Sequence, residues 1–212
     1  MKKTKKDKNI ILTKSFVFNT RRLIIRPYLI SDFNSWKEAH QNMLSPQTPF
    51  DWAHAFLKTQ AHRRKFVSMV KTHQQKRVGP TNYTFAVFKK ITGELVGEVS
   101  MVDASRGGSM SASCGYLIFN NHWRQGYGLE ALRGLIDIAF NKLALHRLEA
   151  YIEVKNRGSQ KLAKMAEFRK EGIAKKRLFF KGAWNDVFVY ALTCEDIGIK
   201  NVRPITYSIP NG

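Results

Sequence analysis

The sequence of 212 residues has few cysteines and no long apolar stretch. Cys114 and Cys194 are its only cysteines, and they do not make the disulfide framework of a small secreted protein. No run of 18 apolar residues occurs, so we expect no transmembrane helix. The apolar residues 10–12 are followed directly by Thr13 and Lys14, which makes this stretch too short for the core of a signal peptide. We therefore expect a cytoplasmic protein with reduced thiols.

Acidic residues are also scarce, with 16 Asp and Glu against 36 Lys and Arg and a formal net charge of +20. A charge of this size favours an acidic partner or ligand, such as RNA, unless the whole proteome is basic. Basic residues are dense in residues 155–181 and again in residues 1–15. We expect residues 1–15 to form a flexible tail. We expect one folded domain over residues 16–194 and a C-terminal extension over residues 195–212.

Several motifs of metal and nucleotide chemistry are absent. The six histidines form no HExxH-type pair, so we predict no metal site. No Gly-x4-Gly-Lys-Ser/Thr motif is present, which argues against a P-loop kinase or ATPase. The sequence also lacks an aromatic-rich RNP motif, which argues against a dedicated RNA-binding module, although the net charge keeps that alternative open.

The hydrophobic pattern predicts an α+β domain with a single, mostly antiparallel sheet. Strands are expected over residues 21–28, 83–90, 94–102, 111–119 and 146–154, followed by a hairpin over 177–192 that turns at Lys181 and Gly182. Helices are expected over 31–43 with Ser31 as N-cap, 52–71, 129–143, and 156–167 with Asn156 as N-cap. Short connections predict an antiparallel meander over 83–119, whereas the helix at 129–143 predicts a βαβ crossover that makes its two flanking strands parallel.

A glycine-spaced loop, NHWRQGYGLEAL (residues 121–132), leads into the crossover helix. A loop that ends in Gly126 and Gly128 at a helix N-terminus can direct backbone N–H groups and the positive end of the helix dipole at an anion. The segment also fits the dinucleotide fingerprint, with Ala131 as its last small residue and Glu149 as the ribose-binding acid. A doubly wound domain needs further parallel βα units, which this chain lacks, so another phosphate-bearing ligand is favoured.

The element order, the loop RQGYGLEAL and the segment NRGSQKLAKMAEF resemble the GNAT superfamily of acetyl-CoA-dependent N-acetyltransferases. The resemblance implies the GNAT fold, in which the sheet splays apart at the βαβ crossover and carries helices on both faces. It also implies acetyl-CoA as co-substrate, with its pyrophosphate held by the backbone of a loop Q/R-x-x-G-x-G/A. The residues that match this loop are Arg124, Gln125, Gly126, Tyr127 and Gly128, and Trp123 stands where the family usually has Gln or Arg.

A closer resemblance, over residues 16–194, is to the RimJ and RimL branch of that family, RimJ most of all. It rests on TRRLIIRPY, HRLEAYIEVKNRGSQKLA, FRKEGIAKKRLFFKGAWNDVFVYAL and the Gly-Tyr-Gly loop. This branch acetylates the N-terminal residue of ribosomal proteins, so the resemblance implies a protein N-terminus, Ala or Ser, as acceptor and a ribosomal protein or the ribosome as partner. The sequence has MAEF where the branch usually has Leu-Gly-Phe, and we expect the turn before Phe168 to have a different shape.

The resemblance also assigns residues to the acetyl donor. Backbone groups of Tyr116, Leu117 and Ile118 should hold the pantetheine arm in the splayed sheet, with one N–H as oxyanion donor. The alternative for these three is an ordinary place in a core strand. Lys161 lies near the expected end of the cofactor, where part of the surrounding positive charge serves the 3′-phosphate. The surplus charge suits ribosomal RNA.

Asn156 and Ser159 match the family motif Asn-x-x-Ala/Ser near the pantetheine, although helix capping explains the same spacing. Many members carry a tyrosine where this chain has Ala163, which leaves Ser159 or a water to protonate the leaving thiolate. Glu98 is the candidate general base, directly or through water, and a plain surface carboxylate is the alternative for it. Glu153 and Tyr190 are second choices.

The acceptor amine attacks the thioester directly in this family, so no acyl-enzyme is implied and Cys114 is expected to be a core residue. The ordinary pKa of a protein α-amine is about 7.7 to 8.0, against about 10.4 for lysine. An N-terminal amine is therefore deprotonated more easily and depends less on a general base. A small amine, an antibiotic or a lysine is an alternative acceptor, because the sequence of acceptor loops such as 43–52 does not indicate which amine they bind. Both a monomer and a homodimer are compatible with the sequence.

Overall fold

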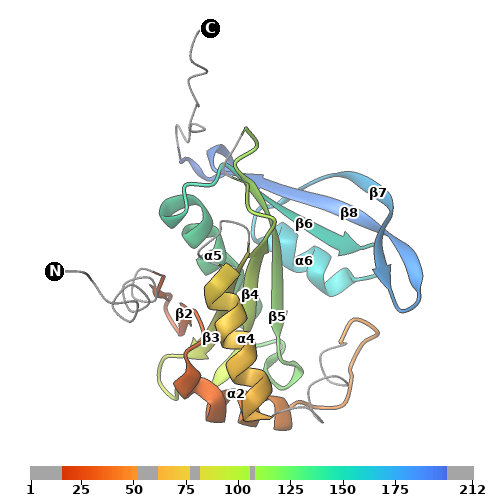
Figure 1. The fold of residues 1–212 in the computed structure, drawn as a ribbon. Helices are drawn as coiled ribbons and strands as arrows, with labels where there is room; N and C mark the ends of the chain where they lie inside the picture. The colour runs from red at the N-terminus through yellow and green to blue at the C-terminus, as the bar shows by residue number, and fades with distance from the viewer. Residues whose placement is uncertain (1–15, 52–61, 77–81, 106–107, 200–212) are drawn as a thin grey trace, which may run out of the picture.

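The computed structural model describes residues 16–51, 62–76, 82–105 and 108–199, which form one sheet covered by helices (Figure 1). The strands are β1 (Phe18–Asn19), β2 (Leu23–Arg26), β3 (Tyr83–Lys89), β4 (Leu95–Val102), β5 (Ser111–Ile118), β6 (Arg147–Glu153), β7 (Arg169–Phe180) and β8 (Ala183–Thr193). The α-helices are α2 (Phe33–Gln41), α4 (Arg63–Lys76), α5 (Tyr127–Asp137) and α6 (Arg157–Met165). A π-helical segment, Ile138–Lys142, continues α5, and 3-10 turns lie at Ile30–Asp32, Asn120–His122 and Glu195–Ile197.

The sheet has the strand order β1-β2-β3-β4-β5-β6-β8-β7. All neighbours are antiparallel except β5 and β6, which are joined by α5 and run parallel. The predicted α+β class, the meander and the single crossover are therefore confirmed. Lys181 and Gly182, both with positive φ, form the predicted turn between β7 and β8.

Two hydrophobic clusters lie on opposite faces of the sheet, because alternate strand residues point to opposite sides. One cluster packs strand residues such as Phe85 and Leu148 against Leu132 of α5 and Ala163 of α6. The other packs Phe88 and Phe119 with aromatic and aliphatic residues of α2 and α4. Figure 1 shows α2 and α4 in front of the meander, and α5 and α6 lie on the other face, so helices cover both faces as expected.

The first part of the chain differs from the sequence-based expectation. Ser31 is not the N-cap of α2: it lies inside a 3-10 turn, and Asp32 is the N-cap. The Asp32 carboxylate accepts hydrogen bonds from Leu29 N–H and the Arg26 guanidinium, which fixes the turn ahead of the helix. The helix expected over 52–71 is α4, which begins at Arg63 and extends to Lys76, and residues 52–61 lie outside the described part.

The end of α6 shows how the chain turns without the usual glycine. Glu167 N–H donates to Lys164 O and Phe168 N–H donates to Ala163 O, each at 3.0 Å, which is the hydrogen-bond pattern of a Schellman motif. This motif needs a left-handed residue, and Glu167 adopts it with φ of 69°. The departure from Leu-Gly-Phe therefore leaves a regular C-cap and places a non-glycine residue in a conformation that glycine favours.

Residues 1–15, expected as a basic tail, lie outside the described part of the chain. Of the expected C-terminal extension, residues 195–199 are described and begin with the 3-10 turn Glu195–Ile197. Among the described helices, none is both long enough and apolar enough to cross a membrane.

Candidate active site

The sheet opens between β5 and β6. These strands pair only over Ser111–Ser113 and Arg147–Glu149, although β5 stays paired with β4 as far as Ile118 and β6 stays paired with β8 as far as Glu153. Beyond the short parallel ladder, the facing edges of β5 and β6 therefore separate. This is the splay that the resemblance led us to expect.

The backbone of β5 presents alternate residues to this gap. Phe119 N–H donates to Val96 O across the β4–β5 register, so the backbone groups of Leu117 point to β4 as well. Those of Tyr116 and Ile118 point to the other side, toward the gap. Of the three backbone sites expected for the pantetheine arm, two thus face the opening, and the Leu117 side chain packs in the cluster beside α2 and α4.

Trp123 has a contact of its own at the end of β5. Its indole N–H donates a 2.6 Å hydrogen bond to Ile118 O, which ties the glycine loop to the strand that lines the gap. The residue that departs from the usual Gln or Arg therefore positions the loop through its side chain.

A cavity of about 200 Å³ fills the gap. Its walls include Tyr116 of β5, Glu153 of β6, Asn156 and Ser159 at the start of α6, and the aromatic pair Phe50 and Phe180. The rings of that pair are stacked with centroids 6.5 Å apart. The cavity thus joins the α6 side of the sheet to a wall formed by the loop before residue 52 and the β7–β8 hairpin.

Asn156 and Ser159 lie together at the start of α6. Asn156 Oδ1 accepts a 3.1 Å hydrogen bond from Ser159 N–H and so caps α6, as predicted, and both residues line the cavity. The Tyr116 hydroxyl donates to Ser159 O at 3.0 Å. Burial raises the pKa of this tyrosine, so its hydroxyl stays protonated at neutral pH. Ala163 is fully buried, and Lys161 is exposed on α6 outside the cavity lining.

The glycine loop ends in a helix N-terminus without a side-chain cap. Gly126 is the N-cap, with φ of 79°, a left-handed conformation that glycine adopts without strain. A Cβ atom on Gly128 would lie 3.4 Å from Leu162 and 3.6 Å from Ile118, so the first turn of α5 packs beside α6 and the end of β5. The free N–H groups of this turn and the helix dipole make an anion-binding geometry next to the gap.

Arg22 holds this loop from β2, although the sequence analysis did not single it out. Its guanidinium donates to Gln125 O at 2.9 Å and pairs with Glu130 in the first turn of α5 at 2.7 Å. The Arg22 side chain also lies over the Tyr127 ring. Arg124 and Gln125 are exposed on the loop. No sequence signal linked Arg22 to a loop about a hundred positions away.

Three candidate carboxyl or hydroxyl groups occupy different environments. Glu98 is half-buried on the α2 and α4 face, and its Oε1 accepts a 2.6 Å hydrogen bond from Tyr28. Burial raises the pKa of Glu98, the direction that suits a general base. Glu98 does not line the cavity. Tyr190 is buried in the core of the other face.

Glu153 lies in the cavity wall itself. Its Oε2 atom is buried and finds no hydrogen-bond partner among the described residues. A buried carboxylate oxygen without a partner is costly, so such a group in a cavity is expected to meet a donor from a ligand.

Cys114 also borders the cavity, where burial raises the pKa of its thiol to about 12. The thiol is therefore protonated and a poor nucleophile at neutral pH. The half-buried Cys114 side chain packs against the core cluster, which fits the expectation of a core residue.

Comparisons with known proteins agree with this geometry. A family model described as an acetyltransferase (GNAT) domain matches residues 22–169. The chain is similar to YjcK, a probable N-acetyltransferase of Bacillus subtilis (strain 168), with 36% identity over 124 residues, which are 58% of this chain and 68% of that protein. It is also similar to the structure of a candidate ribosomal-protein-serine acetyltransferase of Vibrio cholerae, with 29% identity, a TM-score of 0.69 and coverage of 85% of this chain and 99% of that chain. The structure of Mycobacterium smegmatis RimJ in complex with CoA-disulfide matches with 25% identity, a TM-score of 0.69 and coverage of 85% of each chain.

Proposed function

The chain belongs to the GNAT acetyltransferase family, whose members use acetyl-CoA, and we propose that it transfers the acetyl group to the free α-amine at the N-terminus of a protein. The observation that carries this proposal is the cavity between β5 and β6, because it connects the α6 side of the sheet with a separate aromatic wall. In the proposal, the acetyl donor approaches the cavity from the α6 side and the acceptor approaches from the aromatic wall. The similarity to a candidate ribosomal-protein-serine acetyltransferase and to RimJ supports a protein N-terminus, and a ribosomal protein in particular, as acceptor.

The residues around the glycine loop fit the phosphate-bearing donor. In the proposal, backbone N–H groups from Gly126 to Gly128 and the N-terminus of α5 hold the pyrophosphate, with Arg124 and Gln125 beside it. The gap-facing backbone groups of Tyr116 and the N–H of Ile118 pair with the pantetheine arm as an added strand does, because the Ile118 carbonyl already accepts from Trp123. Lys161, exposed on α6, serves the 3′-phosphate.

The acceptor amine enters from the aromatic wall. Phe50 and Phe180 form an apolar entrance, and the unpartnered Oε2 of Glu153 offers an acceptor for an ammonium or amine N–H. An α-amine carries the N–H donors that Oε2 of Glu153 lacks among the described residues. Glu153 is therefore proposed as the group that binds the acceptor nitrogen.

Proton transfer uses two groups from different elements, Glu98 of β4 and Ser159 of α6. Glu98 accepts, through water, the proton that the amine nitrogen loses as its bond to the acetyl carbon forms. The Ser159 hydroxyl relays a proton from water to the sulfur as the carbon–sulfur bond breaks, and Asn156 and Tyr116 hold the Ser159 backbone. The amine attacks directly, because the protonated Cys114 thiol offers no nucleophile for an acyl-enzyme.

The test begins with calorimetric titration by acetyl-CoA and by CoA that lacks the 3′-phosphate, at two salt concentrations. We expect saturable one-site binding of acetyl-CoA, weaker binding of the dephosphorylated ligand and a modest effect of salt. Mass spectrometry then follows acetylation of peptides that begin with Ala or Ser and of the same peptides with a blocked α-amine and a free lysine. Acetylation of the lysine or of small amines alone would overturn the N-terminal acceptor.

A further inference from the structure

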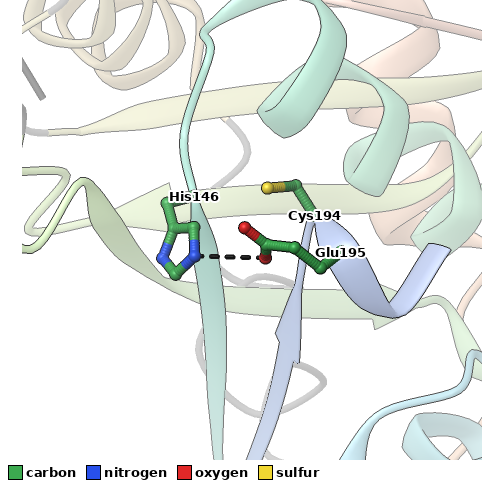
Figure 2. Close-up of side chains that lie close together, drawn as sticks. All are labelled: His146, Cys194 and Glu195. Carbon is green, nitrogen blue, oxygen red and sulfur yellow. Dashed lines mark ion pairs between the residues drawn. The ribbon is translucent and has the colours of Figure 1, made fainter. Parts of the chain in front are cut away.

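Three side chains with metal-ligating atoms lie together outside the cavity, at the closed end of the splay. Figure 2 shows His146, just before β6, facing Cys194 and Glu195, which follow β8. The three ligand atoms, one from each residue, all lie within 4.8 Å of one another. His146 Nε2 and Glu195 Oε2 are 3.1 Å apart.

The backbone holds these positions independently of the side chains. Cys194 N–H donates to His146 O at 2.9 Å, and His146 N–H donates to Met110 O at 2.7 Å. The 3-10 turn after β8 is closed by a 3.0 Å hydrogen bond from Gly198 N–H to Glu195 O. The cluster therefore lies on two strand ends that backbone hydrogen bonds tie to each other and to the start of β5, which is the preorganisation that a binding site requires.

We propose that His146, Cys194 and Glu195 bind a divalent transition metal ion, Zn²⁺ in particular, with water as fourth ligand. Imidazole, thiolate and carboxylate are the side chains that Zn²⁺ prefers, and its bonds to them of about 2.0 to 2.3 Å place the ligand atoms roughly 3.3 to 3.6 Å apart in a tetrahedron. The three ligand atoms lie within 4.8 Å of one another, so side-chain rotation on binding would bring them to these separations. A thiolate, a carboxylate and a neutral imidazole also balance the two positive charges of the ion.

Access and local charge agree with this assignment. Cys194 is fully buried, whereas the His146 and Glu195 side chains are 38% and 54% exposed, so an ion and its water can enter from solvent. The neighbouring guanidinium groups are occupied in ion pairs, Arg147 with Glu149 and Glu171 and Arg169 with Asp196. On binding, the Cys194 thiol releases its proton to solvent and His146 ligates as the neutral ring.

The bound ion would tie the start of β6 to the end of β8 beside the short parallel ladder. The histidines have no close spacing in the sequence, which predicted no metal, whereas these three residues come from two segments far apart in the chain. Metal binding at this end of the sheet does not depend on which amine accepts the acetyl group. The metal site and the proposed function can therefore be tested separately.

Cobalt substitution tests the site on the full chain. We expect the metal-free wild type to bind a single equivalent of Co²⁺, with a sulfur-to-cobalt charge-transfer band in the near ultraviolet and the strong visible bands of a tetrahedral ion. Zn²⁺ should displace the Co²⁺ and raise the thermal midpoint of unfolding as its concentration increases. Wild-type protein with neither the charge-transfer band nor a zinc-dependent midpoint would overturn the proposal.

Variants locate the ligands. Cys194→Ser should abolish the charge-transfer band, and Cys114→Ser, the matched change of the other thiol, should keep it. His146→Gln and Glu195→Gln alter exposed groups, keep the fold testable, and should weaken zinc affinity by at least about tenfold, since even residues that only support metal ligands commonly cost that much. A band that survives Cys194→Ser, or zinc affinity unchanged in both Gln variants, would show that the ion binds elsewhere.

Discussion

The hydroxyl of Tyr28 donates a 2.6 Å hydrogen bond to Oε1 of Glu98 and joins the segment after β2 to β4. Burial, and then the nearby charge of Glu98, raise the pKa of Tyr28 well above its usual value, so the tyrosine remains the donor. Burial raises the pKa of Glu98 as well, and the hydrogen bond from Tyr28 opposes that rise. The proton affinity of the candidate base is thus set by two opposing effects that mutation can separate.

Tyr28→Phe should move the acid limb of the pH profile of kcat/KM to higher pH. The lost hydrogen bond stabilised the charged form of Glu98, so its removal raises the pKa of that carboxyl further. The measurement is steady-state acetylation of an Ala- or Ser-initiated peptide across the acid range. An unchanged acid limb in Tyr28→Phe would remove Glu98 from proton transfer.

Glu98→Gln is expected to lower kcat/KM by about 100-fold or more, the scale of general-base catalysis, and to abolish that limb. The stability of the fold gives a second signature. Because folding raises the pKa of Glu98, its contribution to stability is full below the unfolded pKa and is lost as pH rises through the folded pKa. Denaturation of Glu98→Gln should therefore show a smaller loss of stability relative to wild type at neutral pH than in acid.

Glu153→Gln should raise the KM for the acceptor peptide and leave acetyl-CoA affinity unchanged. We expect an increase of roughly 10- to 100-fold, because a hydrogen bond to a charged group contributes about 1.5 to 3 kcal/mol. The free protein should lose no stability, since Oε2 of Glu153 finds no partner among the described residues. Peptide kinetics, calorimetry and thermal denaturation measure the three effects.

Glu149→Gln is the matched control on the same face of β6. Glu149 accepts hydrogen bonds from Arg147 at 2.8 Å and from Tyr151 at 2.6 Å, so its replacement should destabilise the protein and leave the acceptor KM near the wild-type value. If Glu153→Gln behaves as this control does, Glu153 is a structural residue and does not bind the amine.

The contrast between Asn156 and Glu153 shows which parts of the site the sequence could reveal. The Asn156 cap acts on Ser159, three positions away, so local spacing was enough to predict it. The environment of Glu153 depends on the separation of β5 and β6 and on Phe180 from a distant hairpin. Strand alternation places Glu153 on a face, but only the folded structure shows that one of its oxygens lacks a partner.

The parts of the fold that depend on local signals could also be predicted from the sequence, and those that depend on distant contacts could not. Short connections located the meander, apolar periodicity located the crossover helix, and Lys181 and Gly182 located the final hairpin, because each of these signals is local in the chain. Ser31 was wrong as N-cap since the Asp32 carboxylate bonds to Leu29 and Arg26 and favours a 3-10 turn at that point. The hydrogen bond from Arg22 to Gln125 of the glycine loop likewise joins residues far apart in the chain, so no local sequence pattern predicts it.

Glu167→Gly should stabilise the protein by about 1 kcal/mol, because the residue has φ of 69° and glycine adopts this conformation without a Cβ clash. The Schellman hydrogen bonds involve only the backbone and should persist. Urea denaturation measures the gain, and Glu167→Ala, which keeps a Cβ, should show little change. Equal stability of the Gly and wild-type proteins would mean that Glu167 makes a compensating interaction.

Gly128→Asp and Gly128→Asn together test the proposed anion site. A Cβ at this position meets Leu162 and Ile118 at ordinary contact distances, so both variants should fold. They differ only in charge beside the proposed pyrophosphate, and like charges about 4 Å apart near a protein surface repel by about 4 kcal/mol before salt screening. Calorimetry should therefore show acetyl-CoA binding on the order of 100-fold weaker to Gly128→Asp than to Gly128→Asn, with the difference shrinking as salt increases. Equal affinities, in two variants with the same thermal midpoint, would place the pyrophosphate away from the N-terminus of α5.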